Sequence, residues 1–227
     1  MPRRPQKRVK SAKPSRKVNP PKPIGDDVKF LNSSDLRKVN ESRRSKGKPP
    51  INIEEIIKVF AKYLDENDTD WEPFGYKNSS EWVKAMLEDV RRDKKNTWVF
   101  AVTEDQAVAY ASGEVMTYTV PTTRTSKDEH KDFLYIPNVC SVKPTCGSEA
   151  LKQLIEQQIS NMRCNGVKGD ITVVLNFTPS KKFLVAYYSK MGFKLLSKLS
   201  SPKVCHCARL ITDPVHSVVM YKTCHGV

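Results

Sequence analysis

The order of helix-like and strand-like segments after Ile51 is the feature that most limits how this chain can fold. Two amphipathic helices are predicted first, because residues 51–64 and 80–93 carry apolar side chains at helical spacing. Alternating apolar segments bounded by turn residues then predict strands. The other expected elements are two strands within 97–120 joined at 104–106, a strand at 133–142, a helix at 148–166, a strand at 171–177, a helix at 180–191, a strand at 193–199, and a hairpin of 203–211 with 216–223.

This order, α-α-β-β-β-α-β-α-β-β, predicts an α/β (α+β) protein with a single mixed, mostly antiparallel sheet flanked by helices. A chain of 227 residues with 38% hydrophobic residues can form one sizeable core. We therefore expect one folded domain over residues 51–227.

The segment YYSKMGFKLL, residues 187–196, joins the end of a predicted helix to an apolar strand. Gly192 and Phe193 stand where the helix would stop and the chain would return to the sheet. Tyr187 and Tyr188 lie one turn earlier. They are either packing residues of an amphipathic helix or phenols with a chemical role, and the segment alone leaves both open.

Positive charge is concentrated in the first 50 residues. They hold 16 Lys and Arg against 4 Asp and Glu, a net +12, whereas the other 177 residues hold 23 against 21, a net +2. Because this segment is also proline-rich and poor in large apolar side chains, residues 1–50 are expected to be a basic, disordered tail. The clusters PRRPQKRVK and KPSRK are typical of nuclear import or of contacts with phosphates, so residues 1–48 are a possible nucleic-acid-binding segment. A tail that only improves solubility is the alternative.

No apolar run approaches the roughly 18–20 residues of a membrane-spanning helix, and no signal-peptide pattern is seen. The sequence predicts an intracellular protein without membrane contact, in the nucleus if the source is eukaryotic or viral. Its six cysteines are then expected to be reduced thiols. A zinc site at the C-terminal hairpin is geometrically possible, but no metal is expected because the spacing lacks a CxxC pair. The residues concerned are Cys205, His206, Cys207, His216, Cys224 and His225.

Three motifs in this order resemble the GNAT (GCN-related) N-acetyltransferase superfamily over roughly residues 51–223. The hairpin WVFAV…AVAYASGEV is similar to the family's second and third strands. FLYIPNVCSVKP is similar to its fourth strand, which ends in a Val-x-Pro, here residues 142–144. YYSKMGF is similar to its Tyr-x-x-x-Gly-Phe helix end, with Tyr188, Gly192 and Phe193 at matching positions.

The resemblance implies acetyl transfer from acetyl-CoA to an amine, with the acetyl-pantetheine arm lying where the fourth and fifth strands separate. It implies that the backbone of Val139, Cys140 and Val142 contacts this arm and that Tyr188 protonates the leaving thiolate. Glu114 is the nearest candidate for the general base, with His130 and Asp132 as weaker ones. Backbone donors for the CoA pyrophosphate would come from the loop before the next helix, and one further cofactor contact from the end of the fifth strand: Cys146, Gly147, Ser148 and Asn176.

The loop VKPTCGSEALKQL is about four residues shorter than the family's usual pyrophosphate loop and lacks its basic residue. Two functions therefore stay open. The first is an N-acetyltransferase acting on a primary amine, which is a protein lysine or N-terminus or a small amine. The alternative is a catalytically inactive GNAT-fold protein that binds nucleic acid or protein through its basic tail.

Overall fold

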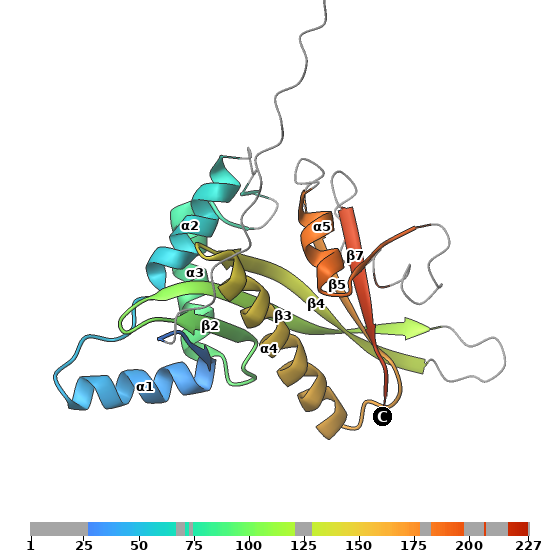
Figure 1. The fold of residues 1–227 in the computed structure, drawn as a ribbon, viewed down its shortest axis with the longest axis horizontal. Helices are drawn as coiled ribbons and strands as arrows, with labels where there is room; N and C mark the ends of the chain where they lie inside the picture. The colour runs from blue at the N-terminus through green and yellow to red at the C-terminus, as the bar shows by residue number, and fades with distance from the viewer. Residues whose placement is uncertain are drawn as a thin grey trace, which may run out of the picture.

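The computed structural model describes residues 27–66, 71–72, 75–120, 129–177, 183–197, 207 and 218–226, with only the backbone described at 120, 129, 130 and 144. Within this part, seven strands form one sheet in the order β1-β2-β3-β4-β5-β7-β6 (Figure 1). Only β4 and β5 pair in parallel, and all other neighbours are antiparallel. The elements are β1 (Lys29–Asn32), α1 (Ser33–Ser45), α2 (Glu54–Asp65), α3 (Ser79–Arg92), β2 (Trp98–Val102), β3 (Ala107–Val120), β4 (Glu129–Ser141), α4 (Pro144–Cys164), β5 (Ile171–Phe177), α5 (Phe183–Lys190), β6 (Lys194–Leu195) and β7 (Val218–Cys224).

The expected single mixed, mostly antiparallel sheet flanked by helices is confirmed. Helices α2 and α3 cover one face, here called the α2 face, and pack on Trp98, Phe100 and Tyr110. Helices α4 and α5 cover the other face, the α4 face, and pack on alternate residues of the same strands, such as Val99, Ala111 and Leu134. Figure 1 shows α4 crossing in front of the sheet with α2 and α3 at its far side. Side chains that alternate along a strand therefore separate cleanly into two cores.

A third apolar cluster lies on the α2 face, at the other end of the sheet. It contains Tyr118, Phe133, Val174, Cys207 and Val219, all less than 5% exposed. The α2 face is thus covered by two apolar clusters, one under α2 and α3 and one over the far parts of β3, β4, β5 and β7. The sheet surface between these two clusters is polar.

The predicted disordered tail of residues 1–50 is wrong for residues 29–45. Here β1 pairs antiparallel with β2, and α1 follows it directly. Leu36 is buried, the Ser33 hydroxyl donates to the Asp93 carboxylate at 2.6 Å, and the Arg37 guanidinium donates to the Asp93 carbonyl at 2.6 Å. The segment was misread because its partners lie about 60 residues away, where local composition gives no sign of them. Residues 1–26 lie outside the described part.

The start of α4 also differs from the prediction. The helix begins at Pro144 and not at Ser148, so only Val142 and Lys143 separate it from β4. Proline is favoured in the first turn because its φ is already helical and its missing N–H is not needed there. The segment from 144 to 147, expected to be a loop, is therefore helical.

The end of α5 confirms the prediction for Gly192 and Phe193. The Phe193 N–H donates to the Tyr188 carbonyl at 3.1 Å, the Gly192 N–H donates to that of Ser189 at 3.0 Å, and Gly192 has a φ of +85°. These bonds close the last turn of the helix around a left-handed glycine. The Lys222 ammonium donates to the Met191 carbonyl at 3.1 Å, which places a cation at this negative helix end.

The C-terminal hairpin is described only in part. Its second arm is β7, which pairs with β5 and β6, whereas the first arm, apart from Cys207, lies outside the described residues, as do Cys205, His206 and His216. Cys207 is buried, and His225 lies 3.2 Å from the Asp170 carboxylate. Across the described ranges, no three His, Cys, Asp or Glu side chains are grouped to hold a metal ion, and no helix is long and apolar enough to span a bilayer.

Candidate active site

The site is built around the point where β4 and β5 separate. The two strands pair only from Leu134↔Val173 to Ile136↔Leu175, although β4 runs on to Ser141 and β5 to Phe177. The next β4 residue is Pro137, which has no N–H for a ladder bond. The β3–β4 register also shifts here, between Ser112 and Glu114, and such a bulge bends the strand. Together these features open the sheet beyond Ile136.

Only alternate residues of β4 turn their backbone N–H and C=O groups toward this opening. The Val142 N–H donates to the Val108 carbonyl of β3 at 3.0 Å, so this amide is not available to a cofactor. Because hydrogen-bonded and free pairs alternate in an antiparallel ladder, Cys140 also faces β3, whereas Val139 and Ser141 turn their N–H and C=O groups toward the opening. Of the three predicted backbone contacts, the geometry is suitable at Val139 and unsuitable at the amides of Cys140 and Val142. Burial raises the pKa of the Cys140 thiol to about 11, so this side chain is neutral.

Two of the predicted backbone donors at the start of α4, the amides of Cys146 and Gly147, are already used within the helix. The N–H groups of Cys146 and Gly147 both donate to the Lys143 carbonyl, at 2.9 and 3.3 Å, and the Ser148 hydroxyl donates to the Thr145 carbonyl at 2.9 Å. Gly147 is pressed against the end of β4, since a Cβ there would lie 2.8 Å from the Ser141 Cβ. This helix start therefore offers an anion fewer free amides than the predicted loop.

Tyr188 lies in the core of the α4 face with a 7% exposed side chain. Its ring contacts Phe177, Tyr187 and Phe193 at centroid distances of 5.8, 5.1 and 5.9 Å. Burial raises its pKa well above the usual value, and the phenols of Tyr187 and Tyr63 raise it further. Tyr63 belongs to α2, which covers the opposite face of the sheet.

Tyr187 lies beside the start of α4. Its hydroxyl is 3.7 Å from the position of a Cβ on Gly147, and a hydrogen bond with Ser148 partly offsets the rise that burial causes in its pKa. The sequence had suggested only a core or surface role for this residue. Its phenol instead lies against the first turns of α4, beside Gly147 and Ser148.

Five polar side chains of β3, β4 and β5 lie near one another on the α2 face of the sheet and are here called the polar band. The Tyr135 hydroxyl donates to the Asn176 side-chain oxygen at 3.0 Å and so links a paired residue of β4 to the first residue of β5 beyond the pairing. The Asn138 amide donates to the Ser112 hydroxyl at 3.1 Å, linking β4 to β3. Glu114 is exposed and lies directly opposite Tyr135 in the ladder. The band comprises Ser112, Glu114, Tyr135, Asn138 and Asn176.

Of the two predicted catalytic residues, Tyr188 is buried in the core of the α4 face, and Glu114 lies exposed on the α2 face of β3, opposite Tyr135. Asn176, predicted as a cofactor contact, directs its side chain to the α2 face and bonds Tyr135. Of the weaker candidates for the base, Asp132 accepts a hydrogen bond from the Thr117 hydroxyl at 2.6 Å, and the side chain of His130 lies outside the described part. Sequence reasoning missed Tyr135 and Asn138, which only the strand register brings beside Glu114.

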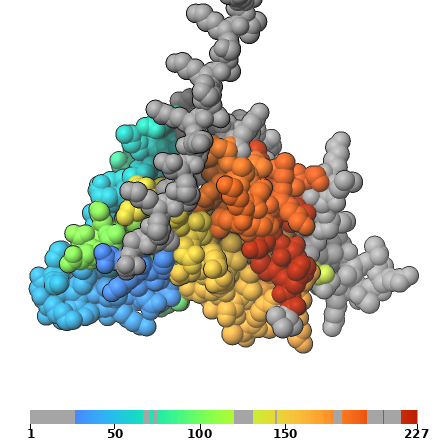
Figure 2. All heavy atoms as spheres, viewed as in Figure 1, coloured from blue at the N-terminus to red at the C-terminus, as the bar shows by residue number. Residues whose placement is uncertain are grey.

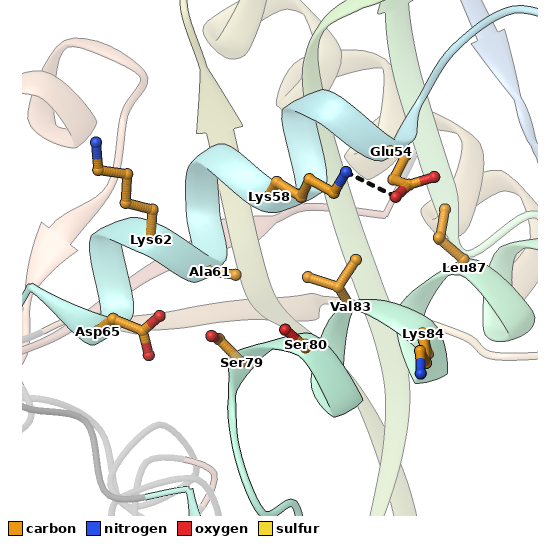
Figure 3. Close-up of a pocket in the computed structure, with 10 residues that line it drawn as sticks. All are labelled: Glu54, Lys58, Ala61, Lys62, Asp65, Ser79, Ser80, Val83, Lys84 and Leu87. Atoms are coloured by element: carbon orange, nitrogen blue, oxygen red, sulfur yellow. Dashed lines mark ion pairs between the residues drawn. The ribbon is translucent and has the colours of Figure 1, made fainter.

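A surface groove of about 360 Å³ lies between α2 and α3 (Figure 3). Its lining comes from these two helices, and Lys58 and Glu54, which form an ion pair at 2.8 Å, are part of it. The other lining residues are Ala61, Lys62, Asp65, Ser79, Ser80, Val83, Lys84 and Leu87. None of the candidate site residues belongs to this groove.

No protein-family model matches the sequence, and no curated protein matches it. Solved structures similar to this chain include an acetyltransferase of the GNAT family from Staphylococcus aureus MU50, with 12% identity, a TM-score of 0.45, and coverage of 86% of this chain and 98% of that one. Ard1 from Thermoplasma volcanium is 11% identical, with a TM-score of 0.42 and coverage of 88% and 99%. A chain of the NatC complex bound to Gag peptide and CoA is 10% identical, with a TM-score of 0.41 and coverage of 87% and 99%. At these identities the similarity concerns the fold and not the activity or the acceptor.

Proposed function

We propose that this chain is an N-acetyltransferase that moves an acetyl group from acetyl-CoA to a primary amine. The observation that supports the proposal is the opening of the sheet between β4 and β5 beyond Ile136, in a sheet that carries the buried Tyr188 phenol on its α4 face and the Glu114 carboxylate on its α2 face. The edge of β4 turns the backbone groups of Val139 and Ser141 into this opening, where a pantetheine amide can pair with them. The donor arm thus fits the residues present.

In the reaction, Glu114 takes a proton from the acceptor ammonium, and the amine nitrogen attacks the thioester carbonyl carbon. The new C–N bond forms, the C–S bond breaks, and the departing sulfur takes the proton of the Tyr188 hydroxyl. The acetylated nitrogen loses a second proton to solvent, Glu114 releases its proton to solvent and the Tyr188 oxygen regains one from it, so the products are an N-acetylated amine, free CoA and one released proton. The raised pKa of Tyr188 suits this role because the phenol stays protonated at neutral pH.

The test uses the full chain. We expect acetyl-CoA to raise the melting temperature and acetyl transfer to a primary alkylamine to be measurable by mass. Tyr188→Phe is expected to lower kcat by about 10²-fold while leaving the affinity for acetyl-CoA within about twofold. No thermal shift at millimolar acetyl-CoA would contradict the proposal, and an unchanged kcat would remove Tyr188 from the mechanism.

A second candidate function is favoured by the start of α4, where the amides expected to bind a pyrophosphate are bonded within the helix. It is a protein without transferase activity that contacts nucleic-acid phosphates through residues 1–48. Arg37 and Arg43 in this segment already donate to backbone carbonyls of the fold, so the remaining cations would bind. This candidate predicts DNA or RNA binding at low salt that is lost when residues 1–26 are deleted, together with no response to acetyl-CoA.

A further inference from the structure

The free edge of β4 is closed at one end and leads to α4 at the other. At the Ile136 end β4 and β5 are paired, so a bulky group cannot continue along the edge there. At the other end only two residues separate Ser141 from α4, and Gly147 lies against Ser141. A thin arm that pairs with Val139 and Ser141 therefore has its bulky end beside the first turn of α4.

This first turn has few N–H groups left for a ligand. A helix begins with four positions whose N–H groups have no partner within the helix, and in α4 these are Lys143, Pro144, Thr145 and Cys146. The Lys143 N–H donates to the Ser141 hydroxyl at 3.0 Å. Pro144 has no N–H, and the Cys146 N–H donates to the Lys143 carbonyl at 2.9 Å. At most the Thr145 amide stays available.

Side chains close the same helix start further. The Ser141 hydroxyl donates to the Lys143 carbonyl, and the Ser148 hydroxyl donates to the Thr145 carbonyl at 2.9 Å. The Tyr187 phenol is hydrogen-bonded to Ser148 and lies over this turn. A helix start holds phosphate through several N–H groups that converge on it. The start of α4 does not provide such a set.

The two halves of acetyl-CoA therefore meet different surfaces. The amides of the pantetheine arm can pair with the backbone groups that Val139 and Ser141 turn to the opening. The phosphates of the nucleotide half come next to a helix start whose donors are already bonded or missing.

We infer that donor recognition ends with the pantetheine arm, so that acetyl-pantetheine is as good a donor as acetyl-CoA. The inference rests on the proposed function, because it defines which part of the donor the site binds. The backbone of Val139 and Ser141 determines donor specificity, and the nucleotide half stays in solvent. The substrate class is then the acyl-pantetheine thioesters, with or without a nucleotide attached.

Binding is measured on the full chain by ligand-observed NMR with pantetheine, CoA and 3′-phospho-ADP as probes. An N–H bond to a charged phosphate would lower Kd by about 10-fold or more, so we expect the Kd values of pantetheine and CoA to agree within about threefold. The nucleotide probe should not displace either of the other two. Because phosphate contacts weaken with salt, the CoA affinity should change by less than about twofold between roughly 0.05 and 0.3 M salt.

A pair of charge variants tests the helix start directly. Lys143→Gln removes the cation at the N-cap of α4, and Lys152→Gln, at an exposed position further along the helix, is the matched control. We expect both variants to keep the CoA affinity of the parent within about twofold. A loss of CoA affinity in Lys143→Gln alone, with pantetheine binding unchanged, would place phosphates there and overturn the inference.

Turnover separates this inference from the proposed function. Acetyl-pantetheine should acetylate a primary alkylamine with a kcat/KM within about threefold of that of acetyl-CoA. CoA that binds about 10-fold tighter than pantetheine, or that 3′-phospho-ADP displaces, would overturn the inference and leave the acetyltransferase in place. Equal binding of CoA and pantetheine without acetyl transfer would remove the acetyltransferase and keep the inference. Binding of neither would contradict both.

Discussion

Tyr110 shows how a single hydroxyl can lower the stability of this fold. Its side chain is 0% exposed beneath α2, and its hydroxyl has no hydrogen-bond partner in the described part of the chain. The ring itself packs well, with Trp98 and Phe100 at centroid distances of 5.4 and 6.0 Å. A buried polar atom without a partner loses its bonds to water and gains nothing in return.

Tyr110→Phe is therefore expected to raise the free energy of unfolding by about 1 kcal/mol, because the ring stays and only the unpaired hydroxyl is removed. Tyr135→Phe is the comparison, since it removes a hydroxyl that is bonded to Asn176 and should lower stability slightly. Urea unfolding of both variants provides the measurement. A loss of stability in Tyr110→Phe would show that its hydroxyl has a partner after all.

The candidate residues differ in how far the sequence could identify them. Tyr188 and Glu114 were selected from motif and strand position; Tyr188 lies in the core of the α4 face and Glu114 on the α2 face of β3, and their roles stay predictions. Cys140 and Val142 were assigned to the wrong side of β4 because the ladder alternation depends on register, which one strand alone does not reveal. Tyr135 could have been found only by aligning β3 with β4 through the bulge.

At the scale of the elements, the contact between α4 and β4 is the closest in the site. Gly147 is fully buried, and any side chain there would meet the Cβ of Ser141. Because only two residues connect the end of β4 to the start of α4, neither element can move away without disturbing the other.

Gly147→Ala is expected to cost about 1–3 kcal/mol of unfolding free energy, as overpacking usually does, even though alanine is the better helix former. Ser160→Ala, at an exposed position of the same helix, should be neutral or slightly stabilising. Thermal unfolding of the two variants gives the comparison. If Gly147→Ala is as stable as the parent, the helix start is not held against Ser141.

Element prediction succeeded where periodicity was strong. Helices α2 and α3 and strands β2, β3, β5 and β7 were expected within a few residues of their observed bounds. It failed for β1, α1 and the first turn of α4. Strand β1 is only four residues long and gains its stability from pairing with β2, and Pro144 was taken as a loop residue although its ring also suits a first helical turn.

At the scale of the whole molecule, β1 and α1 make the N-terminal segment part of the folded body. Figure 2 shows α1 forming one corner of the surface, at the opposite side from α5. The first 26 residues differ, because they hold 9 Lys and Arg against 1 Asp, a net +8, and few large apolar side chains.

A chain starting at Asp27 is thus expected to have a free energy of unfolding within about 0.5 kcal/mol of that of the full chain. The free energy of unfolding of a chain starting at Lys48 should be lower by about 3 kcal/mol or more, because this chain lacks Phe30, Leu31 and the buried Leu36. Calorimetric melting of the two truncated chains tests this. Equal melting temperatures would mean that β1 and α1 contribute little to the fold.

Alkaline pH should weaken the fold through its buried phenols. Burial raises the pKa of Tyr110, Tyr135, Tyr187 and Tyr188 above the usual 10.0. A pKa that is higher in the folded chain gives stability that is complete below the unfolded value and is lost as the pH rises through the folded one. We expect the urea concentration at the unfolding midpoint to decrease as the pH rises from about 10 to about 11.5. This decrease should be smaller in Tyr110→Phe. If the urea midpoints of the parent and of Tyr110→Phe decrease equally with pH, this account is contradicted.

The polar band lies between two apolar clusters on one sheet face, and of its members only Tyr135 packs against one of them. Substitutions in a packed core usually sacrifice stability, whereas most of these five side chains can change without opening a cavity. Such an arrangement keeps most of these polar side chains apart from the packing that holds the chain folded. Evolution, or an engineer, could then exchange one acceptor for another at this surface while the folding of the chain stays almost untouched.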